Sequence, residues 1–460
     1  MSSNKENNRV TPRYKNTSDR FLISINELTK TDICDRQFNV LYERRLDQLT
    51  SRLLEQAANV LGKKCEIESL GKLQPGKKTL IGGIIHKKSK MRPSILNEFE
   101  LPNFRREVEH DVEVEEKDVL TIYDSVCSPE DTIELEYGPQ RIPLIGNIDK
   151  NDFTTGYVLA VYGAPDAAGN FVIEKIIFPK LVDQIPRSIP NEDLYVAFLS
   201  GLDIDSDVSF NQETCLALSQ FVDWIHGGGA SDEDAEISRR VARIVIAGDS
   251  VLIRERNLYD MMLTKLGIKK PVYDPTAVEQ LDRVLDYFVN TVPVDLMSGA
   301  TDICDPMFPQ QPIVVRAFDK CYRHGADMFQ TVTNPYSFEI EDTKLLGTSG
   351  QNLNDSLKYT RGHSRMECMK QFLERSYLVP TSPDTIDGYP VRGEDPFIIN
   401  DVPHVLFAGN QTDHETQMCE LENGARTLLM TIPKFSVKHE VVLLNLRTLK
   451  TDVLCFDTAL

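Results

Sequence analysis

The chain has 460 residues, 41% hydrophobic and 26% charged, with a formal net charge of −19. This composition is typical of a globular protein with two or three domains, and the negative charge argues against a main role in gripping phosphate backbones. The nine cysteines form no C-x-x-C pair, so neither a disulfide framework nor a zinc ribbon is expected. No apolar stretch of ~20 residues and no secretory signal is visible, which predicts a cytosolic or nuclear protein without a membrane span.

The N-terminal 61 residues divide into a tail and a helix. Residues 1–20 are polar and offer almost nothing to bury, so they predict a disordered tail; a nuclear address or a DNA-touching segment is the alternative. Apolar residues then recur at helical spacing between charged ones, at Phe38, Leu41, Leu46 and Leu49 and on to Leu61. This pattern predicts a helix over residues 32–61 that packs as a structural brace.

Residues 62–182 have the pattern of short β-strands. An apolar run at 80–86 is followed by an acidic segment, 107–118, in which valine alternates with Glu or Asp. A strand pair is predicted across Gly138-Pro139, and a hairpin is predicted from strands at 156–163 and 171–179 joined by a Pro-, Asp- and Gly-containing turn. About five short strands in 100 residues favour a small barrel, with the OB-fold as the leading candidate.

The charge of this barrel bears on the kind of ligand it binds. An OB-fold that binds single-stranded nucleic acid presents basic and aromatic residues on one face. The segment at 107–118 is acidic instead, so a role in docking other proteins is favoured over nucleic-acid binding. The alternative that this acidic face is merely solvated stays open.

A proline-containing linker at 181–193 precedes a second domain, 190–460, with alternating strands and helices. Buried strands are predicted at 195–202, 241–247, 292–302 and 403–410, a strand pair within 329–350, and an edge hairpin in the last 35 residues. Helices are predicted at 211–225 and 274–292, the latter capped by Asp274, and residues 226–236 as a flexible acidic loop. Together these elements predict a sheet of about eight or more strands with flanking helices.

The strand at 241–247 ends abruptly in Gly248-Asp249. Chemistry in open α/β sheets lies at the carboxyl ends of the strands, and this end presents a carboxylate. Asp249 is therefore either a metal ligand or the remnant of one.

Several motifs of the second domain carry a resemblance to a known family. They are VPVDLMSGATD (292–302), FPQQPI (308–313), TNPY (333–336) and LLGTSGQN (345–352). With the order of barrel, linker and buried strands, they resemble the DNA polymerase delta/II small subunit family from about residue 35 to the end. The resemblance implies a multidomain α+β and α/β protein: an OB-fold β-barrel plus an inactive calcineurin-like phosphodiesterase sandwich.

The decay of the metal site can be followed in the sequence. A dinuclear metallophosphoesterase needs several His and carboxylate ligands on successive strand ends. Here the corresponding positions hold Ser200, then Asp249 with Leu252, then Thr301 and Asp302, and finally Asn410 and Thr412. Two carboxylates without imidazoles are not expected to hold a metal, so the sequence predicts no catalytic, cofactor-binding or metal-binding residue.

Four other candidates carry little signal. Gly347-Thr348-Ser349-Gly350 is not a Gly-x-Ser-x-Gly elbow and is expected to be a turn after a strand. His226 and His363 lie in predicted loops, and His404 is expected to be a hydrogen-bonded structural histidine. No Gly-rich phosphate-binding loop occurs.

The resemblance implies a non-catalytic accessory subunit of a replicative polymerase. It would bridge the C-terminal cysteine-rich module of the polymerase delta catalytic subunit to a third, clamp-linking subunit, in the nucleus, during replication and repair synthesis. Contact with DNA would be indirect or weak, and no cofactor or membrane is implied. The alternatives are an active metal-dependent phosphodiesterase or exonuclease, and the small (B-type) accessory subunit of polymerase alpha or epsilon.

Overall fold

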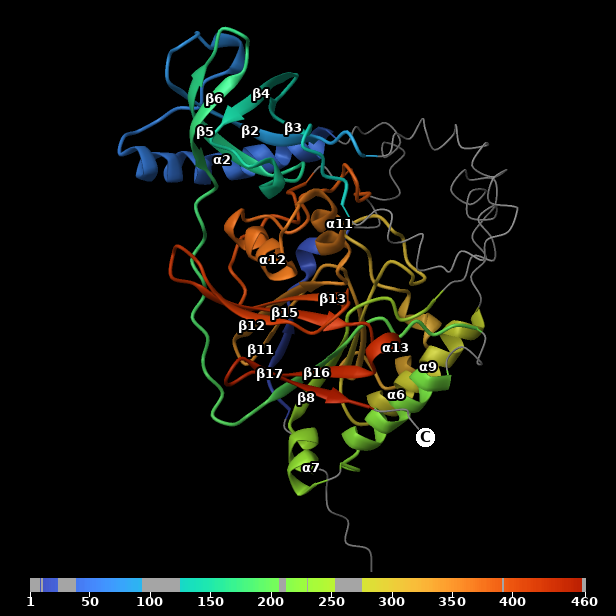
Figure 1. Cartoon of the computed structure of the whole chain (residues 1–460). Coiled ribbons are helices and arrows are strands. Elements are labelled where there is room, and N and C mark those ends of the chain that lie inside the picture. Colours follow the sequence, from blue (N-terminus) through green and yellow to red (C-terminus); the bar gives the residue numbers. More distant parts are fainter. Residues whose placement is uncertain are drawn as a thin grey trace, which may run out of the picture.

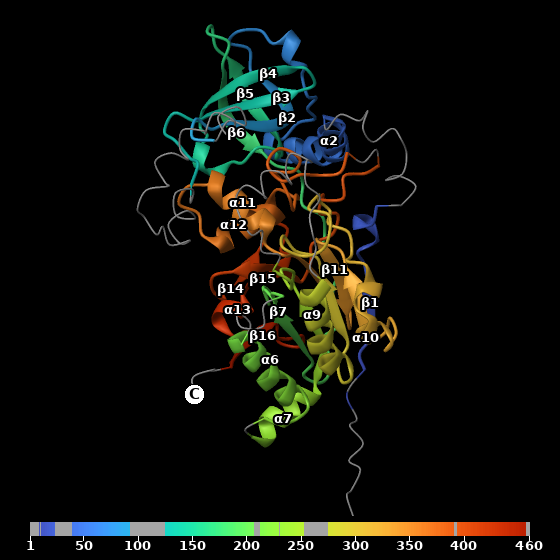
Figure 2. The same ribbon diagram turned by 90° about the vertical axis from the view of Figure 1, so that its right-hand side faces the viewer.

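The structure is a computed structural model. It describes residues 9, 11–23, 39–92, 125–206, 212–229, 231–252, 275–390 and 393–456. A β-barrel lies at one end of the molecule and two larger β-sheets lie below it, with helices between and beside them (Figures 1 and 2). No helix in the described ranges is long and apolar enough to cross a membrane.

The barrel consists of five strands with apolar side chains inside. β2 (Thr79–Lys88), β3 (Thr132–Tyr137), β4 (Gln140–Gly146), β5 (Val158–Pro165) and β6 (Phe171–Ile177) close in the order β2-β3-β4-β6-β5. Alternate residues such as Ile81, Leu135 and Phe171 fill the interior. The predicted strand pair is β3–β4 and the predicted hairpin is β5–β6, so both predictions are confirmed. The acidic strand predicted over 107–118 lies outside the described residues.

The second part contains two six-stranded sheets. One has the order β1-β11-β12-β13-β15-β14 and the other β10-β9-β8-β7-β16-β17. The first is formed by β1 (Tyr14–Asn16), β11 (Tyr336–Ile340), β12 (Thr343–Thr348), β13 (Val405–Gln411), β14 (Thr416–Glu420) and β15 (Arg426–Pro433). The second is formed by β7 (Tyr195–Leu199), β8 (Val241–Ile246), β9 (Val294–Met297), β10 (Phe329–Val332), β16 (Glu440–Asn445) and β17 (Lys450–Cys455).

The two sheets pack face to face, which corrects the prediction of one large sheet. Phe198 and Val245 of one sheet share a buried cluster with Phe338 and Phe407 of the other. Large twisted sheets tend to split into two packed layers. The apolar pattern of a strand does not specify to which layer the strand belongs. The predicted buried strands, the pair β11–β12 and the hairpin β16–β17 are confirmed as individual elements.

Helices cover the outer faces of both sheets. α6 (Gln212–Ile225) and α9 (Pro275–Val289) pack on the sheet that contains β8, through residues such as Phe221 and Leu285. α11 (Gln351–Tyr359) and α12 (Arg365–Glu374) lie between the other sheet and the barrel (Figure 1). The short elements are α10 (Asp319–Tyr322), α13 (Phe435–Lys438), η1 (Asp19–Phe21), η3 (Leu70–Lys72), η4 (Lys150–Asp152) and η6 (Val315–Ala317). Asp274, the predicted cap of α9, lies outside the described residues.

The N-terminal segment is ordered by contacts with the first sheet. β1 pairs antiparallel with β11, and Phe21 is completely buried. The prediction of a disordered tail over residues 1–20 is therefore wrong for residues 11–20, because Tyr14 and Phe21 bury rings in a core that local polarity does not reveal. Residues 1–8 and 10 lie outside the description.

Helix α2 (Asn39–Leu61) joins the barrel to the rest of the molecule. Leu49, Leu53 and Ala57 belong to one apolar cluster that also contains barrel residues, such as Val158, and α12 residues, such as Phe372. The predicted helix is present over its described part, and residues 32–38 lie outside the description. Since the barrel and the sheets share this core, α2 fastens them together.

A charged group lies at the centre of this junction. Arg45 of α2 is fully buried, and its Nε lies 3.1 Å from Asp395 Oδ2. Its two terminal nitrogens donate to Gly156 O of the barrel (2.8 Å) and to Ser382 O of the sheet-containing part (2.7 Å). One guanidinium therefore connects three segments that are remote in sequence.

Part of the predicted acidic loop at 226–236 is helical. α7 (Asp232–Arg239) begins after Ser231, whose hydroxyl accepts the Asp234 amide while the Asp234 carboxylate accepts the Ser231 amide. The prediction is thus wrong from residue 232 onward. Three acidic residues in the first turn favour a helix there, because they lie at the positive end of the helix dipole.

Candidate functional site

Two sets of parallel strands bring their carboxyl ends to the same edge of the two packed sheets. β7, β8 and β9 run parallel in one sheet, and β12, β13 and β15 run parallel in the other. The Gly201 amide donates to Gly248 O (2.9 Å), and the Asn410 amide donates to Ser200 Oγ (2.8 Å). The loops after these strands therefore meet, as the strand-end rule predicts.

Asp249 lies at the centre of this edge in a left-handed backbone conformation, with φ +54°. Its Oδ1 accepts hydrogen bonds from the Ala300 amide (2.6 Å) and the Thr301 amide (3.2 Å). Gly299 is needed beside it, because a Cβ there would lie 2.2 Å from the Asp249 nitrogen. Burial raises the pKa of Asp249, against the opposing effect of the nearby Lys434 ammonium.

Asp302 is the second buried carboxyl group. Its Oδ1 accepts the amides of Ser250 (2.8 Å) and Val251 (3.0 Å), and thereby holds the loop after β8. Its Oδ2 is buried and has no hydrogen-bond partner among the described residues. Burial, together with the negative charge of Asp249, raises the pKa of Asp302 to about 7.

The polar neighbours of these acids are committed to backbone groups. Ser200 Oγ donates towards Ile432 O (3.1 Å) and Pro433 O (3.0 Å). The amide nitrogen of the Asn410 side chain donates to Ala247 O (3.3 Å) and Ser349 O (2.9 Å). These contacts tie the ends of β7, β8, β12 and β13 together.

Two positions of the predicted decayed metal site, Leu252 and Thr412, form hydrogen bonds with other parts of the chain. Thr412 accepts a hydrogen bond from Arg365 of α12, and the Leu252 amide donates to Ile204 O (3.0 Å). The structure therefore brings together Ser200, Asp249, Thr301, Asp302 and Asn410.

Sequence reasoning missed two members of this edge. Lys434 Nζ lies 3.6 Å from Asp249 Oδ2 and 3.4 Å from Asp203 Oδ2. Asp203 follows β7 in a left-handed conformation, with φ +48°. Lys434 belongs to a strand end distant in sequence from both acids, so only the folded topology joins them.

The side-chain atoms available as metal ligands around Asp249 do not fit a pair of divalent ions. Such ions need several carboxylates and imidazoles that can bridge them. Asp249 Oδ1 is already used by two amides, and Oδ2 faces an ammonium group that repels a metal cation. No group of three or more His, Cys, Asp or Glu side chains that could hold a metal ion occurs in the described parts of the chain.

The other candidate residues have structural contacts. His404 is bonded at both ring nitrogens, to the Lys344 amide (2.9 Å) and Ile185 O (2.8 Å). His363 pairs with Asp152 (2.8 Å) and His226 with Val222 O (2.7 Å) and Thr291 (2.8 Å). Ser349 Oγ accepts from Asn334 Nδ2 (2.8 Å) and bonds Gln351, in the turn after β12.

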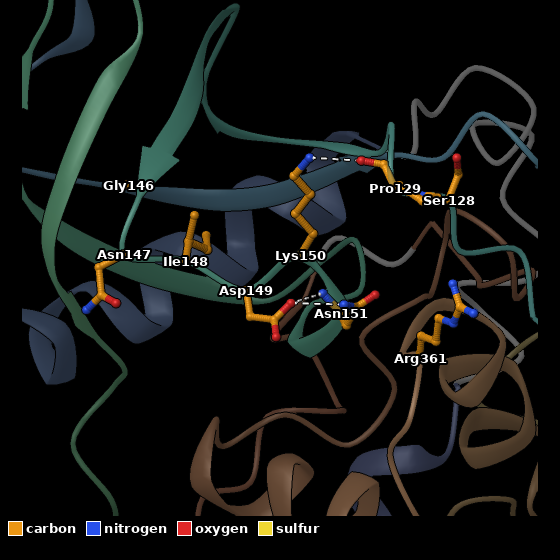
Figure 3. A pocket seen from close by; sticks show the side chains of 9 residues that line it. All are labelled: Ser128, Pro129, Gly146, Asn147, Ile148, Asp149, Lys150, Asn151 and Arg361. Carbon is orange, nitrogen blue, oxygen red and sulfur yellow. Dashed lines mark hydrogen bonds between the residues drawn. The ribbon is translucent and has the colours of Figure 1, made fainter.

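A separate cavity of about 560 Å³ lies where the barrel approaches α11 and α12 (Figure 3). It is lined by residues 146–151, Ser128, Pro129 and Arg361. Lys150 Nζ donates to Pro129 O (3.3 Å), and Asp149 Oδ1 accepts the backbone and side-chain nitrogens of Asn151 (2.9 and 3.1 Å). Its one carboxylate is thus held by a neighbour, and no nucleophile and base are paired among the lining residues.

Comparisons with known proteins find similarity to DNA polymerase subunits along nearly the whole chain. Residues 196–417 match the family of B-type subunits of DNA polymerases alpha and epsilon, and residues 37–176 match the DNA polymerase delta subunit OB-fold domain. The chain is 30% identical to the DNA polymerase delta small subunit of Oryza sativa subsp. japonica, with 97% of this chain and 98% of the relative covered.

Two further relatives are equally long matches. The DNA polymerase delta small subunit of Arabidopsis thaliana is 30% identical, with 100% and 98% of the two chains covered. The DNA polymerase delta subunit 2 of Drosophila melanogaster is 31% identical, with 98% and 99% covered. The barrel is therefore an OB-fold, and the chain belongs to the DNA polymerase delta small subunit family.

Proposed function

We propose that this chain is a non-catalytic accessory subunit of DNA polymerase delta that acts in the nucleus, in replication and repair synthesis. It binds the C-terminal cysteine-rich module of the catalytic subunit and connects it to a third, clamp-linking subunit. The full-length similarity to proteins named as polymerase delta small subunits supports this role.

One observation supports the proposal that the subunit is non-catalytic: the hydrogen bonding of the acids at the carboxyl ends of the parallel strands. We infer that the two packed sheets are an inactive calcineurin-like phosphodiesterase sandwich. Its surviving acids, Asp249 and Asp302, each hold two backbone amides. They stabilise loops, whereas a dinuclear phosphodiesterase uses such carboxylates to hold the two metal ions that activate water.

The rest of the molecule suits a scaffold. The shared core around α2 and the buried Arg45 make the barrel and the sandwich one packed body that can present a fixed surface. The net charge of −19 favours association with a basic protein partner, mainly through faster encounter and better selectivity.

Co-purification of the tagged full chain from cells tests the partner. We expect mass spectrometry to find the polymerase delta catalytic subunit at a near-stoichiometric level. The untagged chain from the same cells is the control. Recovery of primase instead would assign the chain to polymerase alpha and would overturn the proposal.

A hydrolysis assay tests the lack of catalysis. We expect the purified chain to show no manganese-stimulated cleavage of a phosphodiester substrate, and the Asp249→Ala variant to give the same background rate. An active member of the phosphodiesterase class serves as the positive control. Manganese-dependent turnover that disappears in the variant would contradict a purely structural edge.

A further inference from the structure

The backbone of Lys434 is fixed between the two sheets. Its amide donates to Gln411 O of β13 (3.1 Å), and the next two amides donate to Ser200 O (2.7 Å) and Gly201 O (2.9 Å) after β7. Because both sheets hold this segment, the start of the Lys434 side chain has a defined position.

Gly201 provides room for the Lys434 side chain. A Cβ at Gly201 would lie 2.7 Å from Lys434 Cγ, closer than van der Waals contact allows. The same Cβ would lie 2.7 Å from Asn410 Oδ1, a buried oxygen without a hydrogen-bond partner among the described residues. The aliphatic part of Lys434 thus passes over the glycine, next to an unused acceptor.

The ammonium group ends between two carboxylates. It lies 3.4 Å from Asp203 Oδ2 and 3.6 Å from Asp249 Oδ2, and the three side chains are 34%, 16% and 9% exposed. Ser436 Oγ donates to the same Asp203 oxygen (2.7 Å) and holds it in place. Two acids this close repel each other unless a cation lies between them.

We propose that this edge is a cation site which the chain fills with its own Lys434 ammonium, and which accepts a small primary ammonium ion when Lys434 is shortened. An ammonium group donates hydrogen bonds to oxygen acceptors, and Asp203 Oδ2 and Asp249 Oδ2 supply them. A divalent ion such as Mg²⁺ demands near-ideal octahedral oxygen geometry, which this set does not offer. The inference goes beyond the accessory role and does not depend on it.

The test is chemical rescue of Lys434→Ala in the purified full chain. We expect its melting temperature to fall by about 1–2 °C relative to wild type. Propylammonium replaces the atoms that the substitution removes, so about 100 mM of it should restore at least half of the loss by binding the folded state. Tetramethylammonium at equal ionic strength, which has no N–H donor, should restore none.

Two variants make the test specific. Lys438→Ala removes a more exposed lysine of α13 that pairs with Asp413 (3.0 Å), and it should show neither the loss nor the rescue. Adding Asp203→Asn and Asp249→Asn to Lys434→Ala should abolish the propylammonium response, because neither carboxylate that faces the ammonium group remains. An unchanged melting temperature in Lys434→Ala, equal rescue by tetramethylammonium, or rescue by Mn²⁺ in place of the amine would each overturn the proposal.

Discussion

Replacing Arg45 with methionine is expected to lower the free energy of unfolding by about 3–5 kcal/mol. The guanidinium is fully buried and neutralises Asp395, whose Oδ2 also accepts the Tyr377 hydroxyl at 2.6 Å. Methionine has a similar length but no charge, so the variant leaves the buried Asp395 without its ion-pair partner. It also leaves Gly156 O and Ser382 O without their donor.

Urea unfolding followed by circular dichroism measures this loss. Arg44→Met is the matched control, because Arg44 is the neighbouring residue of the same helix and is exposed. A surface change of this kind should stay within about 0.5 kcal/mol of wild type. The double variant Arg45→Met/Asp395→Leu should recover much of the loss, since it removes the stranded charge as well. Equal stability of the Arg45 and Arg44 variants would contradict a structural role for the buried pair.

Arg45 also shows where sequence reasoning stops. The helical spacing of leucines predicts α2 and its apolar face, because that periodicity is a local property. The same spacing places Arg45 on the buried face, four residues from both Leu41 and Leu49. It does not show that Asp395, which is remote in sequence, neutralises the buried guanidinium. Long-range pairing of this type leaves no trace in the local pattern.

The distinction between local patterns and long-range contacts also applies to the sheets and the site. Strand β8 and the hairpin β5–β6 follow from apolar runs and turn residues, whereas the assignment of twelve strands to two sheets depends on contacts between distant segments. The meeting of Asp249 and Asp302 could be predicted, because both follow parallel neighbouring strands. Lys434 could not, because it reaches the edge from the opposite sheet.

Asp302→Asn is the second large effect, and here the substitution is expected to stabilise the protein. The pKa of Asp302 is raised to about 7 by burial and by the negative charge of Asp249. Asp249 in turn pairs with Lys434. Between about pH 4 and pH 7 the folded state keeps a proton that the unfolded state has released. Rising pH therefore removes stability across this window, by at most about 4 kcal/mol.

Asparagine is neutral at every pH, and its Oδ1 can still accept the Ser250 and Val251 amides. The advantage of the variant over wild type should be smallest near pH 4 and reach its full size above pH 7. Urea unfolding of both proteins at pH 5 and pH 8 should show the difference in their unfolding free energies growing by roughly 2–3 kcal/mol. The carboxylates that do not interact with Asp302 are common to both proteins, so their titration cancels in this comparison.

Asp305→Asn provides the control, since it changes an exposed acid three residues further along the same loop. At pH 5 and at pH 8 its free energy of unfolding should stay within about 0.5 kcal/mol of wild type. The sign of the Asp302→Asn effect separates the two interpretations of this edge. A buried acid that only holds two amides loses a destabilising charge when it becomes asparagine, whereas a ligand of a required metal ion loses a stabilising one. A variant that is less stable than wild type at pH 8 would therefore contradict the structural role, and a more stable one would show that the loop after β8 is held without the charge.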